Sequence, residues 1–166
     1  HLNQAIARPC VGHQGEKSMH LTRSGRRLAL GLLLACGATA ATAAPFLLVT
    51  LNTAGVSQIT VSYLLRDIDG SNDNAVTPVA LHYRVGTSGT YANVPAAFVA
   101  DACDGPAAAT KITAVSVELP TNADNQPVIQ LRIMTTNSVG NDEWVGVDNV
   151  CVTATLVDGD GDGVAD

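Results

Sequence analysis

Aspartates at alternate positions near the end of the sequence form its clearest pattern of candidate metal ligands. Asp158, Asp160 and Asp162 alternate with glycines, and Asp166 stands four residues further on. In a tight loop such carboxylates converge on one hard cation, and Ca²⁺ takes roughly six to eight oxygen ligands. Gly163 permits the sharp turn that the loop needs. The pattern predicts a Ca²⁺ site with these ligand residues: Asp158, Asp160, Asp162, Val164 through its carbonyl, and Asp166.

The order of these residues resembles the start of a thrombospondin type 3 repeat, whose units run D-x-D-x-D-G-x-x-D. The resemblance covers residues 157–166. It implies a structural role for Ca²⁺, which would turn a self-repelling acidic tail into an ordered spacer. An EF-hand loop has a further acid at its twelfth position, and the sequence does not reach that position. A solvated linker rich in Gly and Asp is the alternative interpretation.

Other polar residues that could do chemistry are isolated. Asp148 is a second candidate Ca²⁺ ligand, with a turn cap or a solvent-facing carboxylate as the alternative. Asp67 and Asp69 precede a turn, and we interpret them as turn-forming residues because Asp side chains bond to nearby backbone N–H groups. His82 is expected on the outer face of a strand. The sequence contains no nucleophile elbow, phosphate-binding loop or zinc-binding spacing, so we predict a module that is not an enzyme.

An export signal is expected before the folded region. From Met19, arginines precede a short apolar run at 28–35, and small residues end at Ala43. This order is typical of a secretory signal, and the run is too short to cross a bilayer, which takes about 20 apolar residues. We therefore assign 1–18 as an upstream segment and 19–43 as the signal, and expect an extracellular or cell-surface location. Lipidation of Cys36, which stands in a lipobox-like context, is an alternative anchoring route.

The region from residue 44 onward is strongly acidic. It has 14 acidic side chains and these four basic ones: Arg66, Arg84, Lys111 and Arg132. Because nucleic-acid affinity comes largely from Lys and Arg that neutralise phosphates, this module is not expected to bind nucleic acid by itself. Two cysteines, Cys103 and Cys151, predict a disulfide in an exported protein, with two unpaired core cysteines as the alternative.

Apolar and polar residues alternate with period 2 along this region, which is typical of half-buried strands. Tyr63 and Tyr83 fall on core-facing positions, whereas a continuous apolar run at 46–51 predicts a more fully buried strand. The expected strands are 46–51, 58–66, 79–85, 111–119, 128–134 and 144–156. Their spacing and the turn-forming clusters between them predict an all-β fold over 44–156, an antiparallel β-sandwich or jelly roll.

Three stretches resemble a β-sandwich module of large exported bacterial proteins: 64–70, 83–89, and 132–137 with 141–148. The last stretch is the most specific, and the resemblance covers residues 46–154. Such modules often precede an endonuclease/exonuclease/phosphatase-type catalytic domain in extracellular nucleases, and they also occur with other surface domains. In that family further β structure precedes the region of Phe46, which leaves open whether this sandwich is truncated at its N-terminal side.

Three hypotheses for function follow. The first is a non-catalytic secreted or cell-surface module for positioning or adhesion, with a Ca²⁺-binding tail from residue 157 that leads to a downstream domain. The second is the accessory domain of a larger extracellular nuclease whose catalytic domain lies beyond Asp166. The third is a glycan-binding module, which would use exposed aromatic side chains. Tyr91 and Trp144 are its candidates, although Trp144 is better explained as a core residue.

Overall fold

The computed structural model describes residues 45–136 and 143–157. The upstream segment 1–18, the signal 19–43, Cys36 and the predicted Ca²⁺ ligands of 158–166 lie outside the described residues. Within those two ranges, no helix has the length and apolar character that crossing a membrane requires.

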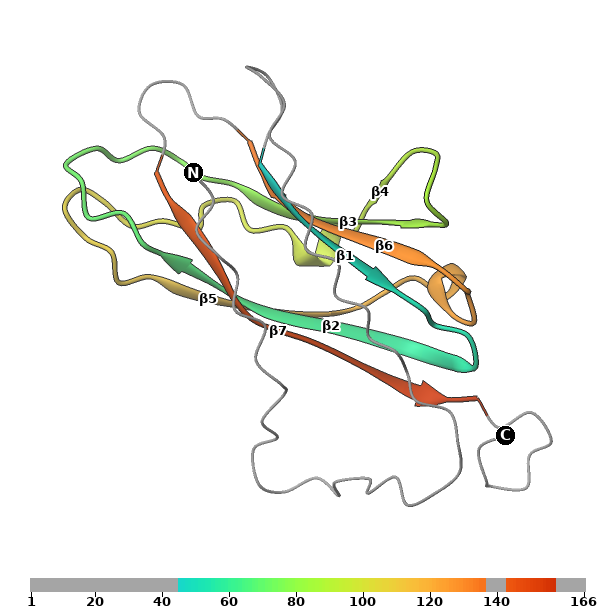
Figure 1. Ribbon diagram of the computed structural model, residues 1–166. Coiled ribbons are helices and arrows are strands. Elements are labelled where there is room, and N and C mark those ends of the chain that lie inside the picture. Colours follow the sequence, from blue (N-terminus) through green and yellow to red (C-terminus); the bar gives the residue numbers. More distant parts are fainter. Residues whose placement is uncertain (1–44, 137–142, 158–166) are drawn as a thin grey trace, which may run out of the picture.

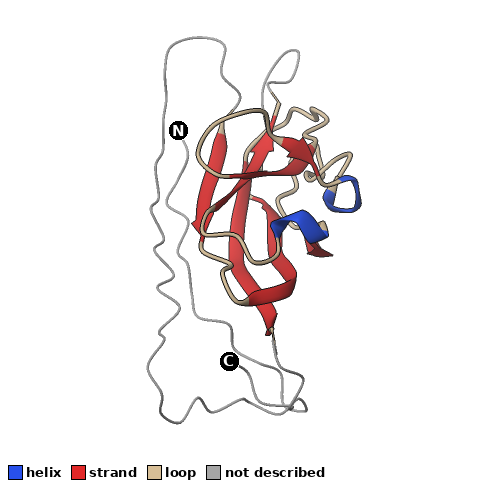
Figure 2. Cartoon of the chain, turned by 90° about the vertical axis from the view of Figure 1, so that its right-hand side faces the viewer, coloured by secondary structure: helices blue, strands red, loops and turns tan. Residues whose placement is uncertain are grey.

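The described chain forms two antiparallel sheets that enclose one core (Figure 1). In strand order, one sheet contains β1 (Phe46–Leu51), β6 (Ile129–Thr135), β3 (Val79–Val85) and the short β4 (Ala92–Asn93). The other contains β5 (Ile112–Glu118), β2 (Val56–Asp67) and β7 (Val145–Leu156). Two short 3₁₀ helices, η1 (Pro95–Ala97) and η2 (Thr121–Ala123), lie in the connections, and Figure 2 shows them beside the strands. The predicted all-β sandwich is therefore confirmed.

Alternate residues of the strands fill the core between the sheets, because successive side chains of a strand point to opposite faces. Tyr63 and Tyr83 are both buried, as the alternation predicts. The largest side chains that are fully buried are Tyr63, Ile59, Leu65, Leu81, Ile129, Leu131, Val61 and Val79. They come from β2, β3 and β6, so both sheets contribute to one apolar interior.

β1 differs from its prediction. It is not buried on both faces: Leu47, Val49 and Leu51 are buried, whereas Phe46 and Leu48 are half-buried. The reason is the two-layer architecture, because only the inner face of each sheet packs against the other sheet; β6, in the middle of the same sheet, alternates in the same way. The continuous apolar run therefore has one core-facing side here.

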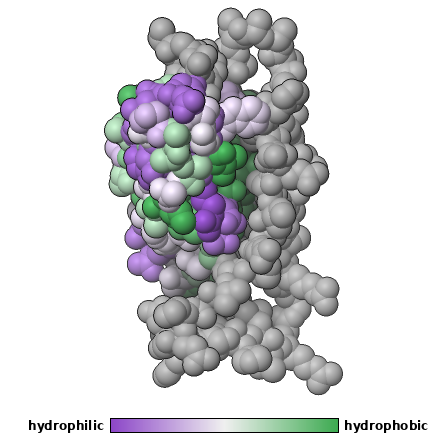
Figure 3. Space-filling model, turned by 90° about the vertical axis from the view of Figure 1, so that its left-hand side faces the viewer, coloured by the Kyte–Doolittle hydropathy of each residue, from purple (hydrophilic) through white to green (hydrophobic). Residues whose placement is uncertain are grey.

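Trp144 also differs from its prediction, because it is 45% exposed and does not belong to the core. The preceding residue, Glu143, is buried at 8% exposure. Neighbouring residues of an extended chain point to opposite sides, so the inward direction of Glu143 sends Trp144 outward. Figure 3 views this end of the molecule, where strongly hydrophilic residues and apolar residues adjoin on the surface.

Candidate metal centre

Three connections meet at the end of the sandwich where β2 finishes, on the left in Figure 1. Backbone hydrogen bonds tie them together. The Asp67 N–H donates to the Lys111 carbonyl at 3.0 Å, and the Ile68 N–H donates to the Trp144 carbonyl at 3.0 Å. The Ala102 N–H donates to the carbonyl of Thr77 at 2.9 Å. The loop after β2, the loop before β5 and the residues before β7 are thereby held against one another.

Asp67, Cys103 and Glu143 come from these three connections and form one buried cluster. One ligand atom of each side chain lies within 4.8 Å of the others, and their exposures are 4%, 3% and 8%. Asp67 is the last residue of β2 and continues the inward series of that strand, so strand periodicity carries a carboxylate into the interior. No other group of three such residues occurs in the ranges 45–136 and 143–157.

Backbone N–H groups bind three of the four carboxylate oxygens in the cluster. Asp67 Oδ1 accepts from the Asp69 N–H at 3.0 Å, and Asp67 Oδ2 accepts from the Asp104 N–H at 2.7 Å. Glu143 Oε1 accepts from the Ala75 N–H at 2.9 Å. The fourth oxygen, Glu143 Oε2, is buried and has no hydrogen-bond partner among the described residues. The interpretation of Asp67 as a turn-forming residue thus describes only one of its contacts.

Cys103 carries a free thiol, so the predicted disulfide between Cys103 and Cys151 is wrong. Cys151 is in a disulfide, but Cys103 is not its partner. Cys103 lies beside the end of β2 at Asp67, whereas Cys151 pairs with Ser62, five residues back along β2. At about 3.3 Å per residue, Ser62 and Asp67 are roughly 17 Å apart along β2. A disulfide needs Cα atoms within about 7 Å.

The thiol of Cys103 has a raised pKa. Burial raises the pKa to about 12, and a hydrogen bond with Thr77 acts in the opposite direction; the charge of Asp67, a hydrogen bond with Glu143 and the charge of Glu143 raise it further. The Cys103 Sγ lies 3.9 Å from the carbonyl oxygen of Trp144. A protonated thiol is a poor nucleophile and a poor metal ligand, so the carboxylates dominate the chemistry of the cluster.

No basic side chain in the described ranges forms an ion pair with Asp67 or Glu143. The ammonium group of Lys111 donates to the backbone carbonyl of Cys103 at 3.1 Å. A further carboxyl group lies next to the cluster, since hydrogen bonding with Asp67, followed by that with Thr110, lowers the pKa of Asp104 to about 2. Buried carboxylates are normally paired with a cation, and the residues of 45–136 and 143–157 supply none.

Gly105 allows further oxygen atoms to approach Glu143. A Cβ atom built on Gly105 would lie 2.8 Å from the Asp73 carbonyl oxygen, 3.1 Å from Asn74 Oδ1 and 3.1 Å from Glu143 Oε1. Three oxygens from two different connections therefore converge around a residue that has no side chain. Oxygen-rich surroundings of this kind suit a hard cation such as Ca²⁺.

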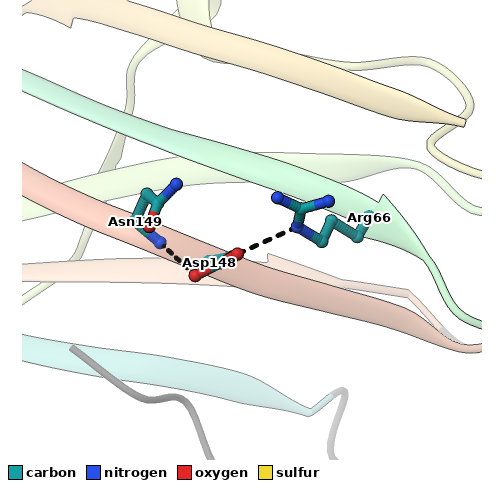
Figure 4. Close-up of polar contacts among 3 residues, drawn as sticks. All are labelled: Arg66, Asp148 and Asn149. Atoms are coloured by element: carbon teal, nitrogen blue, oxygen red, sulfur yellow. Dashed lines mark hydrogen bonds and ion pairs between the residues drawn. The ribbon is translucent and has the colours of Figure 1, made fainter. Parts of the chain in front are cut away.

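Asp148, the second Ca²⁺ ligand predicted from sequence, lies elsewhere (Figure 4). Its Oδ2 lies 2.9 Å from Arg66 Nε, and its Oδ1 accepts from the Asn149 N–H at 2.7 Å. Both charged side chains are more than a third exposed, at 39% and 36%. Asp148 is therefore in a solvent-facing ion pair, which corresponds to the alternative interpretation and gives no support to a metal ligand at this position.

The outer face of the four-stranded sheet carries the other charged cluster. The ring centroid of Tyr91 lies 4.4 Å from the guanidinium carbon of Arg84 and 4.3 Å from that of Arg132. His82 is on this outward side, with its Nδ1 2.9 Å from Arg132, and its pKa is lowered by burial and by Arg132. The Tyr91 ring is thus already stacked on arginine, which leaves Trp144 as the more accessible of the two predicted glycan-binding residues.

Comparisons with protein-family models, with curated proteins and with solved structures gave no match to this chain. The resemblances to an exported nuclease module and to a thrombospondin type 3 repeat therefore stay expectations from sequence. Sequence reasoning missed the metal-ligand cluster because Cys103 and Glu143 stand far apart from Asp67 along the chain. The one available signal was the period-2 register of β2, which reaches Asp67 on its inward side.

Proposed function

We propose that this chain is a non-catalytic, exported or cell-surface β-sandwich module that positions a partner or a neighbouring domain. The observation that supports the proposal is the burial of Asp67, Cys103 and Glu143, at no more than 8% exposure each. Side chains that act on a substrate must reach it. These side chains face inward and join three connections, so their chemistry suits a structural role.

The end of β7 supports a positioning role for the segment that follows. β7 is 12 residues long, and it pairs with β2 as far as its last residue, Leu156, which lies opposite Val56. The Val157 N–H then donates to the Gly55 carbonyl at 2.9 Å, so the backbone is fixed up to the start of the acidic tail. In this proposal the aspartates from Asp158 to Asp166 bind Ca²⁺, and the ordered tail extends from a fixed point on the sandwich.

Limited proteolysis tests the tail. The full chain is digested with a broad-specificity serine protease in millimolar Ca²⁺ or in EDTA, and mass spectrometry locates the cuts. We expect the bonds after Val157 to be protected by Ca²⁺, because a bound ion orders the carboxylates around it. The variant D158N/D160N/D162N is the control and should be cut equally in both conditions. Equal digestion of the unmodified tail with and without Ca²⁺ would contradict the spacer role.

Glycan binding is the second candidate function, and one observation favours it. Trp144 is 45% exposed next to the first residue of β7, and an exposed indole ring can stack on a sugar ring. This role also needs no catalytic residue.

A further inference from the structure

We propose that the buried carboxylates of Asp67 and Glu143 bind a divalent cation of the Ca²⁺ class, which fastens the three connections at this end of the sandwich. This site lies within the folded body and is separate from the tail. It depends on contacts of the described residues and does not depend on the proposed function of the segment after Val157.

The first argument is the unpartnered oxygen of Glu143. Its side chain is more than nine-tenths buried, and Oε2 has no hydrogen-bond partner in the described ranges. A buried carboxylate oxygen without a donor or a cation is destabilising, and such atoms are rare in folded proteins. One ligand atom each of Asp67, Cys103 and Glu143 lies within 4.8 Å of the others, so the carboxylate that carries this oxygen belongs to a cluster of ligand-type side chains.

The second argument is spacing. Ligand atoms of Asp67 and Glu143 are within 4.8 Å of each other. Calcium binds oxygen at roughly 2.3–2.6 Å, so one ion can contact two oxygens at up to about twice that distance. Two carboxylates at this separation in a buried site repel one another unless a proton or a cation lies between them. One bound cation would neutralise this charge and would also give Glu143 Oε2 a partner.

The third argument is the kind of donor atom. The Asp73 carbonyl and Asn74 Oδ1 converge with Glu143 Oε1 around Gly105, which makes the surroundings rich in oxygen. Hard oxygen donors select Ca²⁺, whereas zinc prefers thiolate and imidazole. Cys103 is the one soft donor in the cluster, beside two carboxylates. The ion we infer is therefore held by oxygens, with Cys103 as a neighbour.

Calcium titration calorimetry on the tail variant D158N/D160N/D162N tests the site, because this variant lacks the three alternating aspartates of the tail. We expect one Ca²⁺ per chain. At 100-fold excess over Kd, the melting temperature should rise by on the order of 10 °C. Glu143→Gln in the same background should abolish the uptake and the rise. Glu118→Gln, at an exposed position of β5, is the matched control and should retain both.

Two further measurements guard against misfolding and against a different metal. In EDTA, Glu143→Gln should melt at or above the temperature of its parent, because it removes an unpaired buried charge; circular dichroism verifies that it is folded. Cys103→Ser should keep Ca²⁺ binding. Three results would overturn the proposal: no Ca²⁺ uptake by the tail variant, uptake that Glu143→Gln leaves unchanged, or uptake of Zn²⁺ alone that requires Cys103. None of these results bears on the proposed spacer role, which is tested separately by proteolysis of the unmodified tail.

Discussion

Replacement of Gly105 by alanine is the sharpest probe of the packing around the cluster. The added Cβ would lie 2.8 Å from the backbone oxygen of Asp73, closer than real Cβ atoms approach any atom, and 3.1 Å from Asn74 Oδ1 and Glu143 Oε1. A backbone oxygen cannot rotate away as a flexible side chain can. The two connections must therefore move apart by a few tenths of an ångström, and the hydrogen bond from the Ala75 N–H to Glu143 Oε1 must adjust with them.

Overpacking of this kind typically costs about 1–3 kcal/mol in the free energy of unfolding. Gly70→Ala is the matched control, because a Cβ at Gly70 meets nothing within 4 Å. It should be neutral or should stabilise by about 0.4–1 kcal/mol, since alanine restricts the unfolded chain. With a urea m-value of roughly 1–3 kcal/mol/M, the two variants should differ in midpoint by about 1 M. Equal midpoints in EDTA would refute the close approach of oxygens around Gly105.

Two other predictions concern single aromatic residues. Tyr63→Phe should stabilise the protein by about 1 kcal/mol at neutral pH, because the Tyr63 hydroxyl is buried without a partner in the described chain. Burial raises the pKa of Tyr63 to about 12, whereas the unfolded phenol titrates near 10, so the unfolded state loses its proton first. Stability of the parent should therefore fall as pH rises from about 10 to about 12, and urea titrations should show a smaller fall for the Phe variant. Trp144→Ala should abolish retention on a polysaccharide that the parent binds while the melting temperature stays unchanged; retention by the variant would exclude Trp144 as the sugar platform.

The sandwich was largely predictable because each strand presents one face to the core and one to solvent. Five of the expected strands agree with β2, β3, β5, β6 and β7 to within two residues at each end. β1 was found at its expected residues, but its edge position depends on sheet order, which periodicity does not encode. The two-residue β4 pairs with β3 through Tyr83 and His82 and has no pattern long enough to detect.

The cluster was not predictable from spacing, because its members meet only when three connections converge. Asp67 lies 36 positions before Cys103 and 76 before Glu143. The predicted partner of Cys103 was chosen by counting cysteines, and the register of β2 with β7 places Cys151 far from that end of the strand. Local patterns identify ligands only when one loop supplies them, as the aspartates after Val157 would.

The period-2 pattern of the strands also bears on the cation that we propose for the cluster. Along β2 the inward positions Val61, Tyr63 and Leu65 are apolar, and the next inward position is Asp67. On the other side of the same end, Glu143 takes the inward direction and leaves the larger apolar side chain, Trp144, in solvent. A sequence selected for stability alone would reverse both choices, since burying a carboxylate costs free energy and exposing an indole gains none. Such conflicts with the core pattern are expected at functional sites. Asp67 and Glu143 have ligand atoms within 4.8 Å of each other, and one oxygen of Glu143 has no partner among the described residues. The cation that we propose would account for both choices.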